Sequence, residues 1–281
     1  MMYGYGILNN HVPTLRATVM GANGGGASIT DTDVLAFISA ASITTSSHKS
    51  AINTLVLDLK SASIWTKMKA VYPFVGGTAS QHKFNLKDPR DLDAAYRLQF
   101  VNGWTHSATG ALPSGTDGYA ETYLTPSSVL TSPFIGYYSR SNTNTGIDQV
   151  DMGCGDSSNR YLWVSTFYNA SGYSNILARN SSASVLLNGG PNDGSRGWYW
   201  TNKIGTTAKL GKNSTILTSS TDTETPPSFS ITIGKLNNSA YPTFTNREVA
   251  FSVIANGLSD TDTTNLYTAI NTFNTTLSRN V

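Results

Sequence analysis

The stretch that decides the fold lies at the end of the chain and reads, from Phe229 to Leu277, FSITIGKLNNSAYPTFTNREVAFSVIANGLSDTDTTNLYTAINTFNTTL. Hydrophobic and polar residues alternate from Phe229 to Ile233 and again from Arg247 to Val253, which is the period of a strand with one buried face. Gly234 ends the first run. The pattern predicts two half-buried strands whose inward side chains are Phe229, Ile231, Ile233, Val249, Phe251 and Val253.

A helix is expected directly after the second strand. Ser259 can accept hydrogen bonds from the free amides of a first helical turn, and Asp262, three residues on, can reach back to it. Leu266, Ile270 and Phe273 then recur at helical spacing. A helix with one apolar stripe must lie on another element, and the preceding sheet is the simplest choice.

The closing segment resembles that of laminin-G-like, concanavalin A-type β-sandwich domains of the pentraxin kind. The resemblance implies an all-β fold: an antiparallel β-sandwich or jelly roll followed by a short helix. A fold does not fix a function, which must be argued from a site. The matching positions, in the family's order, are Ile233-Gly234, Phe244, Arg247 to Ile254, Leu258-Ser259-Asp260 and Leu266-Tyr267.

A second resemblance covers the beginning of the β region. Trp65 to Ala79, continued by Lys83 to Asp88, is similar to a segment of bacteriophage virion proteins that carry the same closing motif, and Phe100, 103–106 and 118–120 extend it. It implies a structural protein of the virion, made in the bacterial cytoplasm: a fibre, a tail or baseplate subunit, or a head decoration. By analogy with phage fibres it implies a homotrimer, and it implies a host-surface glycan as a further partner.

Short strands follow one another through the middle of the chain. Runs of strand character recur about every ten residues, with Gly, Asn and Ser between them, which is typical of a sandwich. We therefore assign 67–281 to one β-sandwich. The candidate strands are Met68 to Val75, His82 to Lys87, Tyr96 to Val101, Ala120 to Leu124, Phe134 to Tyr138, Ile147 to Cys154, Tyr161 to Tyr168, Asn175 to Arg179, Gly197 to Asn202, Thr206 to Leu210 and Ser214 to Leu217.

The first 26 residues are too apolar for a solvated tail and end in a glycine-rich hinge. We interpret 1–26 as an arm that docks on other virion proteins; folding back on its own sandwich is the alternative. The apolar residues expected to make the contact are Tyr3, Tyr5, Leu8, Val12 and Leu15.

Two short helices are predicted in 27–66. Thr30 can cap the first, with Asp33 three residues on, and the second runs from Ser46 to Lys60 with Ile52, Leu55, Val56 and Leu59 on one face. They form either a subunit contact or a cap on the edge of the sandwich.

Composition excludes several partners. The net charge is +2 and there is no polybasic run, so nucleic acid is not expected as a partner. No apolar stretch approaches the ~20 residues of a membrane span, so membrane insertion is not expected. The single cysteine, Cys154, excludes an internal disulfide and is predicted to be a small buried hydrophobic residue.

The acidic residues and histidines do not form a familiar catalytic or metal-binding pattern. Retaining glycosidases need two carboxyl groups about 5 Å apart. The three glutamates, Glu121, Glu224 and Glu248, lie far apart in the sequence, so we predict no catalytic residues and keep glycoside hydrolase as a distant third function. Asp148 and Asp151 fall on opposite faces of a strand and are expected to be solvated or turn-bonded. The four histidines lack ligand spacing, so no metal and no cofactor are predicted.

Aromatic residues are the better indication of a binding site. Trp198 and Trp200 share one strand face, and Tyr161, Trp163 and Phe167 share a face of another strand. One set must be core; the other either stacks on sugar rings, as in a carbohydrate-binding adhesin, or is buried by packing and a neighbouring subunit. Trp104 and Tyr119 flank a loop and are further candidates. The predicted ligand-binding residues are Trp104, Tyr119, Trp198 and Trp200.

Overall fold

The computed structural model describes residues 28–143, 148–170, 173–192 and 194–281. The predicted arm, 1–26, lies outside them. The described helices are α1 (Thr32–Ala40), α2 (Ser46–Ser61), α3 (Ala79–His82), α4 (Pro126–Val129) and α5 (Asp260–Thr276), with 3-10 turns η1 (Trp65–Lys67) and η2 (Asp93–Ala95).

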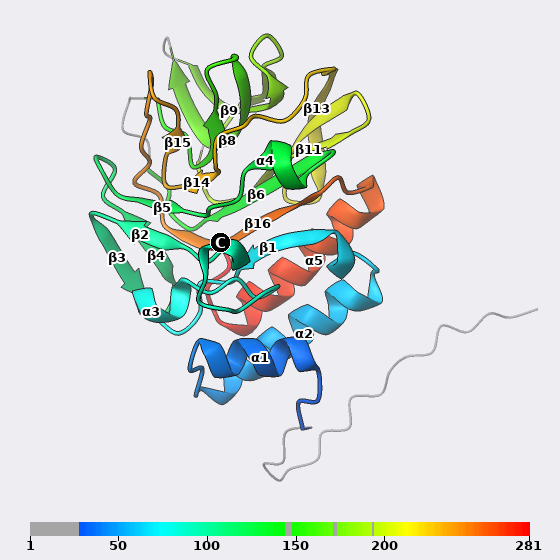
Figure 1. Cartoon of the computed structure of the whole chain (residues 1–281). Coiled ribbons are helices and arrows are strands. Elements are labelled where there is room, and N and C mark those ends of the chain that lie inside the picture. The colour runs from blue at the N-terminus through cyan, green and yellow to red at the C-terminus, as the bar shows by residue number, and fades with distance from the viewer. Residues whose placement is uncertain (1–27, 144–147, 171–172, 193) are drawn as a thin grey trace, which may run out of the picture.

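Within these residues the strands form two sheets packed face to face (Figure 1). The helix-side sheet has the order β13-β12-β11-β6-β16-β4-β3, with β1 also paired to β16. Its strands are β1 (Met68–Tyr72), β3 (Trp104–Ser107), β4 (Gly110–Pro113), β6 (Pro133–Ser139), β11 (Gly197–Ile204), β12 (Thr207–Lys212), β13 (Thr215–Thr221) and β16 (Val249–Asn256).

The second sheet has the order β10-β9-β8-β7-β14-β5-β2 and is antiparallel along this path, whereas β15 pairs with β7 in parallel. Its strands are β2 (Gln99–Val101), β5 (Tyr119–Glu121), β7 (Met152–Gly155), β8 (Arg160–Ala170), β9 (Tyr173–Ser182), β10 (Leu187–Pro191), β14 (Thr232–Ile233) and β15 (Leu236–Asn237).

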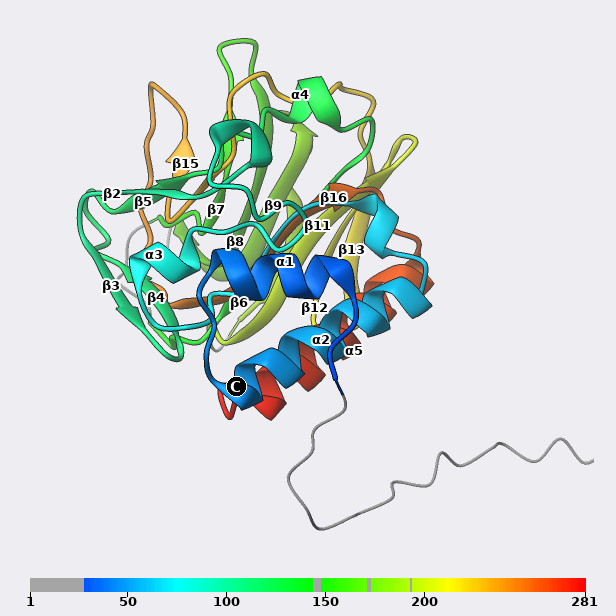
Figure 2. The ribbon, with the colours of Figure 1, turned by 60° about the horizontal axis from the view of Figure 1, so that its bottom comes forward.

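Three helices cover the helix-side sheet on the side away from the second sheet. Figure 2 shows α1, α2 and α5 together on that side. Phe37 of α1, Leu55 of α2 and Phe273 of α5 share one apolar cluster with Phe251 of β16. The helices of 27–66 therefore cover the face of the sandwich, and the prediction that the last helix lies on the preceding sheet is confirmed.

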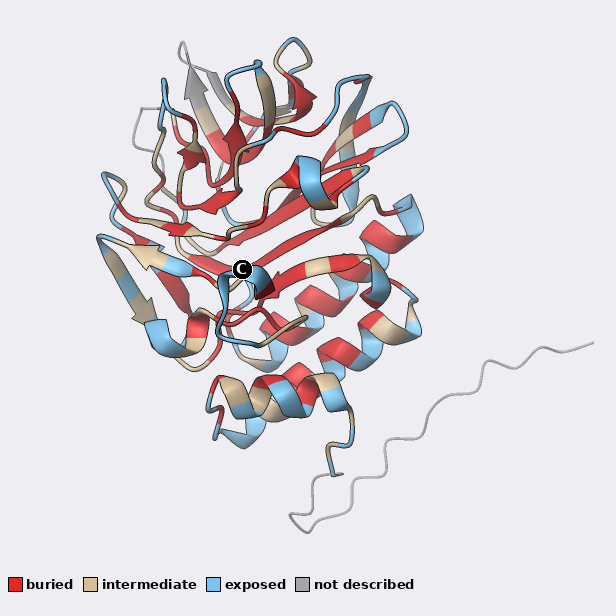
Figure 3. Ribbon diagram, in the orientation of Figure 1, coloured by how far each residue is buried: buried red, intermediate tan, exposed pale blue. Residues whose placement is uncertain are grey.

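A second apolar cluster fills the space between the sheets. Ile135 and Tyr137 of β6 meet Met152 and Leu162 of the second sheet there, each fully buried. Figure 3 shows the buried residues concentrated in the strands of both sheets and along one side of the helices. The described residues thus form a two-layer β-sandwich with two helices before it and one after it, and the all-β prediction is confirmed.

Strand β16 is buried on both faces, whereas the sequence predicted only one buried face. Val249 belongs to the cluster between the sheets, whereas Phe251 and Val253 belong to the cluster under the helices. A register shift between Val249 and Phe251 in the pairing with β6 reverses the faces. The prediction that these three side chains share a face is therefore wrong, because a bulge adds one residue to the alternation.

Some predictions made from short stretches of sequence are confirmed by the structure and others are wrong. The capping box of Ser259 and Asp262 is present at α5, and Cys154 is buried. The cap of α1 is Asp31 rather than Thr30. The strand predicted from His82 to Lys87 does not form, although Phe84 and Leu86 are buried; β3, β4, β10 and β15 were not predicted.

Candidate functional site

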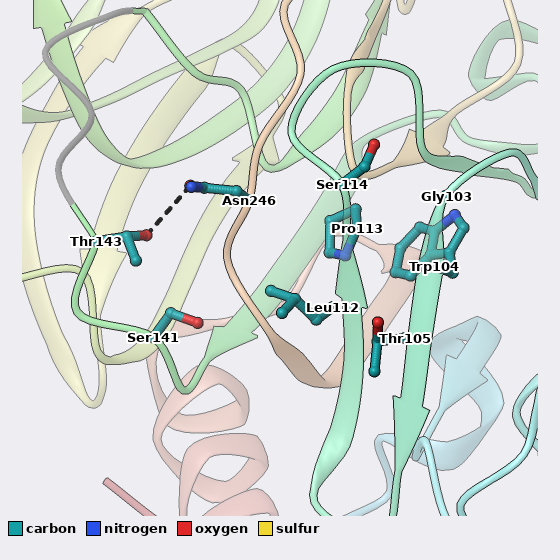
Figure 4. A pocket seen from close by; sticks show the side chains of 9 residues that line it. All are labelled: Gly103, Trp104, Thr105, Leu112, Pro113, Ser114, Ser141, Thr143 and Asn246. Atoms are coloured by element: carbon teal, nitrogen blue, oxygen red, sulfur yellow. Dashed lines mark hydrogen bonds between the residues drawn. The ribbon is translucent and has the colours of Figure 1, made fainter.

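A hollow of about 520 Å³ lies where the β3–β4 hairpin faces the segments that follow β6 and precede β16 (Figure 4). Its walls combine hydroxyl groups, an amide, a proline, a leucine and a tryptophan. The lining residues are Gly103, Trp104, Thr105, Leu112, Pro113, Ser114, Ser141, Thr143 and Asn246.

The hairpin side of the hollow is set by pairing at the edge of the helix-side sheet. Thr105 and Leu112 lie opposite each other on β3 and β4, and both are exposed. Gly110, at a φ of +155°, lets the hairpin approach β16, because a Cβ there would lie 2.3 Å from the Val249 carbonyl oxygen. The close approach fixes the position of the Thr105–Leu112 pair relative to β16.

Asn246 supplies the polar wall on the opposite side. Its Oδ1 accepts hydrogen bonds from Thr143 Oγ1 at 3.3 Å and from Gln149 Nε2 at 3.1 Å. Both hydrogen bonds end at the side-chain oxygen. The Nδ2 amino group has no hydrogen-bond partner among the described residues. An amide held in this way can offer two N–H donors to a ligand in the hollow.

Trp104 borders the hollow and is held firmly. Its Nε1 donates to the Tyr119 carbonyl oxygen at 3.0 Å, and its ring packs against Phe100 with centroids 5.2 Å apart and against His106 with centroids 6.1 Å apart. Tyr119 does not line the hollow; the Lys235 ammonium lies 3.5 Å from its ring centroid. The structure thus places Trp104 at this site and puts Tyr119 behind it.

Trp198 and Trp200 are not at any surface. Both side chains are 0% exposed and lie in the cluster beneath the helices. A Cβ on Gly136 would lie 2.2 Å from the Trp198 ring, and one on Gly211 would lie 2.1 Å from the Trp200 ring, so each indole lies over a glycine. Their prediction as ligand-binding residues is wrong, because α1, α2 and α5 cover a sheet face that the sequence left open to solvent.

The acidic residues of the described chain are largely used in internal contacts. Glu248 forms an ion pair with Arg140 at 2.9 Å, and Glu121 accepts from the amides of Thr122 and Tyr123. Asp151 is fully buried in an ion pair with Arg247, so the prediction of a solvated or turn-bonded carboxylate is wrong for it. Among the described residues no group of three or more His, Cys, Asp or Glu could hold a metal ion.

Sequence reasoning missed most of this hollow. Ser141, Thr143 and Asn246 come from loops that lie far apart in sequence and carry no motif of their own. The one signal in the sequence was Trp104, an aromatic residue beside a loop. In the described part of the chain, no helix has both the length and the apolar character needed to cross a membrane.

Comparison with solved structures supports the fold. A mutant of Trypanosoma rangeli sialidase displaying trans-sialidase activity superimposes with a TM-score of 0.53 at 10% identity, covering 79% of this chain and 39% of the sialidase. Part of that protein therefore shares the β-sandwich fold, and at such an identity the similarity carries the fold alone. No family model and no curated protein sequence matches the chain.

Two further structures are similar at lower scores. Domain 4 of AbnA, an extracellular arabinanase from Geobacillus stearothermophilus, in complex with arabinotriose, has a TM-score of 0.43 at 16% identity, covering 72% of this chain and 98% of that domain. The binding domain of botulinum neurotoxin DC in complex with SialylT has a TM-score of 0.49 at 10% identity, covering 73% of this chain and 52% of that one.

Proposed function

We propose that this protein is a non-enzymatic subunit of a bacteriophage particle whose sandwich binds carbohydrate on the host surface. The observation that carries the proposal is the hollow beside Trp104, in which the Asn246 amide and several hydroxyl groups face the exposed Thr105–Leu112 pair. Its volume of about 520 Å³ suits a ligand of one or a few sugar units.

The chemistry of the walls matches that of a sugar. Pyranose rings combine hydroxyl groups with apolar C–H faces, and they bind well where polar side chains surround an aromatic or aliphatic surface. Thr105, Ser141 and Thr143 supply hydroxyls that can donate or accept, and Asn246 supplies donors. Leu112 and Trp104 supply the apolar surface.

A role without bond cleavage is favoured by the state of the carboxylates. Among the described residues no acidic side chain lines the hollow, and Glu248 is already paired with Arg140. Hydrolysis by two carboxyl groups would need a free acid on either side of the sugar bond. We therefore assign binding rather than catalysis to this hollow.

The virion assignment is supported by the sequence resemblance alone. We propose that the arm, 1–26, attaches the subunit to other virion proteins and that three copies associate. The order of the chain fits this arrangement: the apolar arm precedes the helices, and the Trp104 hollow lies on the sandwich, beside the β3–β4 hairpin at its edge (Figures 1 and 4).

A glycan array with the full chain tests the binding function. We expect the wild-type protein to bind a restricted set of glycans and Asn246→Ala to weaken that binding by roughly tenfold, the value of one or two lost hydrogen bonds. Asn265→Ala, an exposed position on α5, is the matched control and should bind as the wild type. If the wild type binds no glycan, the sandwich has a purely architectural role in the particle.

A further inference from the structure

A second hollow lies on the outer face of the second sheet and shares no lining residue with the Trp104 hollow. Its volume is about 330 Å³, within the range of small-molecule sites. It differs in chemistry, because three tyrosines, a tryptophan and an arginine dominate its walls. The lining residues are Val150, Asn159, Tyr161, Trp163, Tyr168, Arg179, Ala183, Leu236, Tyr241 and Thr243.

Strand pairing builds the floor of this hollow. Trp163 of β8 lies directly opposite Arg179 of β9. Tyr161 is two residues from Trp163 and so lies on the same face. A register shift between Ser165 and Tyr168 brings Tyr168 to this face too, where its ring stacks on Trp163 with centroids 5.8 Å apart at 21°.

The segment around β15 closes the hollow from the side. Leu236 packs with Trp163 in a small apolar cluster, and the Leu236 amide donates a hydrogen bond to the Thr243 carbonyl oxygen at 2.9 Å. Tyr241, between them, is 72% exposed and is the most exposed large apolar side chain described. A ligand in the hollow would therefore meet a buried aromatic floor and an exposed aromatic rim.

Arg179 is unusual among the described arginines. Every other one donates at least one hydrogen bond: Arg247 to Asp151, for example, and Arg279 to three backbone carbonyls and Asn274. The guanidinium of Arg179 makes none to a described residue, and its Nη1 is fully buried. The guanidinium lies over the Tyr161 ring, whose centroid is 5.9 Å from Cζ.

Removing a cation from water without a counter-ion raises the free energy of the folded protein, and pairing with an anion reduces this penalty. Burial lowers the pKa of Arg179 from its ordinary value, while the nearby Tyr161 and Tyr168 oppose that shift. Asp148 is already engaged with Tyr168: burial, then the hydrogen bond and the charge of Asp148, raise the pKa of Tyr168 to about 12. Thr243 Oγ1, also in this hollow, is a second buried polar atom without a partner.

We propose that this hollow binds a carboxylate-bearing sugar, with the guanidinium of Arg179 paired to the sugar carboxylate and the ring held between the tyrosines. A planar guanidinium offers two parallel N–H donors to a carboxylate, and the pair is stronger than a neutral hydrogen bond. Tyr161, Tyr168 and Tyr241 present flat faces and hydroxyl groups, which suit a ring that carries its own hydroxyls. Thr243 can bond one of them.

The test is isothermal titration of the full chain with glucuronic acid and with N-acetylneuraminic acid, using galactose as the neutral probe. We expect at least one acidic sugar to bind and Arg179→Gln to weaken it about tenfold or more, as expected for loss of a charge-assisted bond. Arg196→Gln, an exposed arginine outside the hollow, removes the same charge and should leave the affinity unchanged. Equal loss in both variants would overturn the proposal.

Two further outcomes keep the proposal falsifiable. Galactose binding as tightly as the acidic sugars, or inorganic phosphate competing as strongly as glucuronate, would overturn the assignment to a sugar carboxylate. Tyr241→Ala, at the exposed rim, should weaken binding without affecting folding. Asn246→Ala should not change acidic-sugar binding, so failure of the Trp104 hollow and failure of this one are distinguishable.

Discussion

Arg247 and Asp151 form a fully buried ion pair that joins the start of β16 to the segment before β7. Arg247 Nη1 lies 3.0 Å from Asp151 Oδ1 and 3.1 Å from Oδ2. Thr245 Oγ1 donates to Oδ1 at 2.7 Å, and the Thr166 amide donates to Oδ2 at 2.6 Å. The pair crosses from one sheet to the other next to Asn246, so it holds one wall of the Trp104 hollow in place.

Asp151→Asn should destabilise the protein strongly, because it leaves the buried Arg247 without its counter-ion. Breaking a buried pair from one side costs about 3 to 5 kcal/mol. Urea unfolding followed by tryptophan fluorescence measures the change. Asp93→Asn, which breaks the exposed Asp93–Arg97 pair, should cost no more than about 1 kcal/mol. Equal midpoints for the two variants would contradict the structural role given to Asp151.

Phe251→Asp should prevent folding, because Phe251 is 0% exposed and packs its ring against Phe273 of α5 with centroids 5.6 Å apart. A carboxylate there has no partner and would be buried as a charge. Solubility and circular dichroism report the loss. Ile216→Asp, on β13 where the residue is 38% exposed, should fold normally. A soluble Phe251→Asp variant with unchanged melting would refute the packing of α5 on β16.

Asp262 should make α5 sensitive to acid. Burial by itself raises the pKa of Asp262, but hydrogen bonds from Lys67 and Ser259 outweigh it and hold the pKa below the ordinary 3.8. A carboxyl group with a lowered folded pKa stabilises the protein above its unfolded pKa, and this stabilisation is lost as the pH falls through the folded value. Asp262→Asn should lower the free energy of unfolding by about 1 kcal/mol at pH 7 and by much less at pH 2. Urea unfolding at both pH values measures it; an equal cost at both would contradict the argument.

His82 should weaken the fold as the pH falls below about 6.5. It is 1% exposed, and burial, with the nearby His106 and Arg279, lowers its pKa to about 3. Between 6.5 and about 3 the unfolded chain therefore binds a proton that the folded chain does not, so stability decreases with falling pH by up to about 1.4 kcal/mol per pH unit. Unfolding free energies at pH 7, 6 and 5 give the slope.

The variant His82→Gln isolates this effect. The Gly77 amide donates to His82 Nε2 at 3.2 Å, and His82 Nδ1 lies 2.9 Å from His106 Nδ1, so both ring nitrogens are engaged in the neutral form. Glutamine cannot take up a proton. The unfolding free energy of this variant should therefore depend less on pH between pH 7 and pH 5, whatever its absolute value. A slope identical to that of the wild type would show that another group carries the dependence.

Removal of residues 1–26 should leave the sandwich intact but prevent incorporation into particles. All the apolar clusters of the described structure are formed by residues from 29 onward. Thermal melting of the truncated chain should therefore match that of the full chain, and a particle-assembly assay should detect no incorporation. Normal incorporation of the truncated chain would rule out the arm as the attachment element.

Local signals could be predicted because they depend on neighbours in the sequence. The Ser259–Asp262 capping box, the apolar stripe of α5 and most strands were found from spacing alone. Face assignments were less secure, because one inserted residue in β16 moved Phe251 to the other side of the sheet from Val249. The residues from Val249 to Val253 alternate as those of a regular strand would, so the sequence did not reveal the bulge.

The choice between the two aromatic sets was likewise beyond the sequence. Trp198-Tyr199-Trp200 and Tyr161-Leu162-Trp163 both alternate as strands of a sandwich do, and either tryptophan-bearing face could lie inside. The three helices cover Trp198 and Trp200, whereas Tyr161 and Tyr168 line a hollow on the outer face of the second sheet. Which face is covered depends on residues 32–61 packing against β16, some 200 positions away.

The amino-acid sequence by itself determined the β-sandwich, the two helices before it, the helix after it and the absence of a strong charge, since these follow from periodicity, caps and composition. Only the tertiary structure decided which aromatic side chains reach a hollow and which acids are neutralised by buried partners. The physical reason is that burial and ion pairing depend on contacts between segments far apart in the chain, such as Arg247 with Asp151 and Lys67 with Asp262.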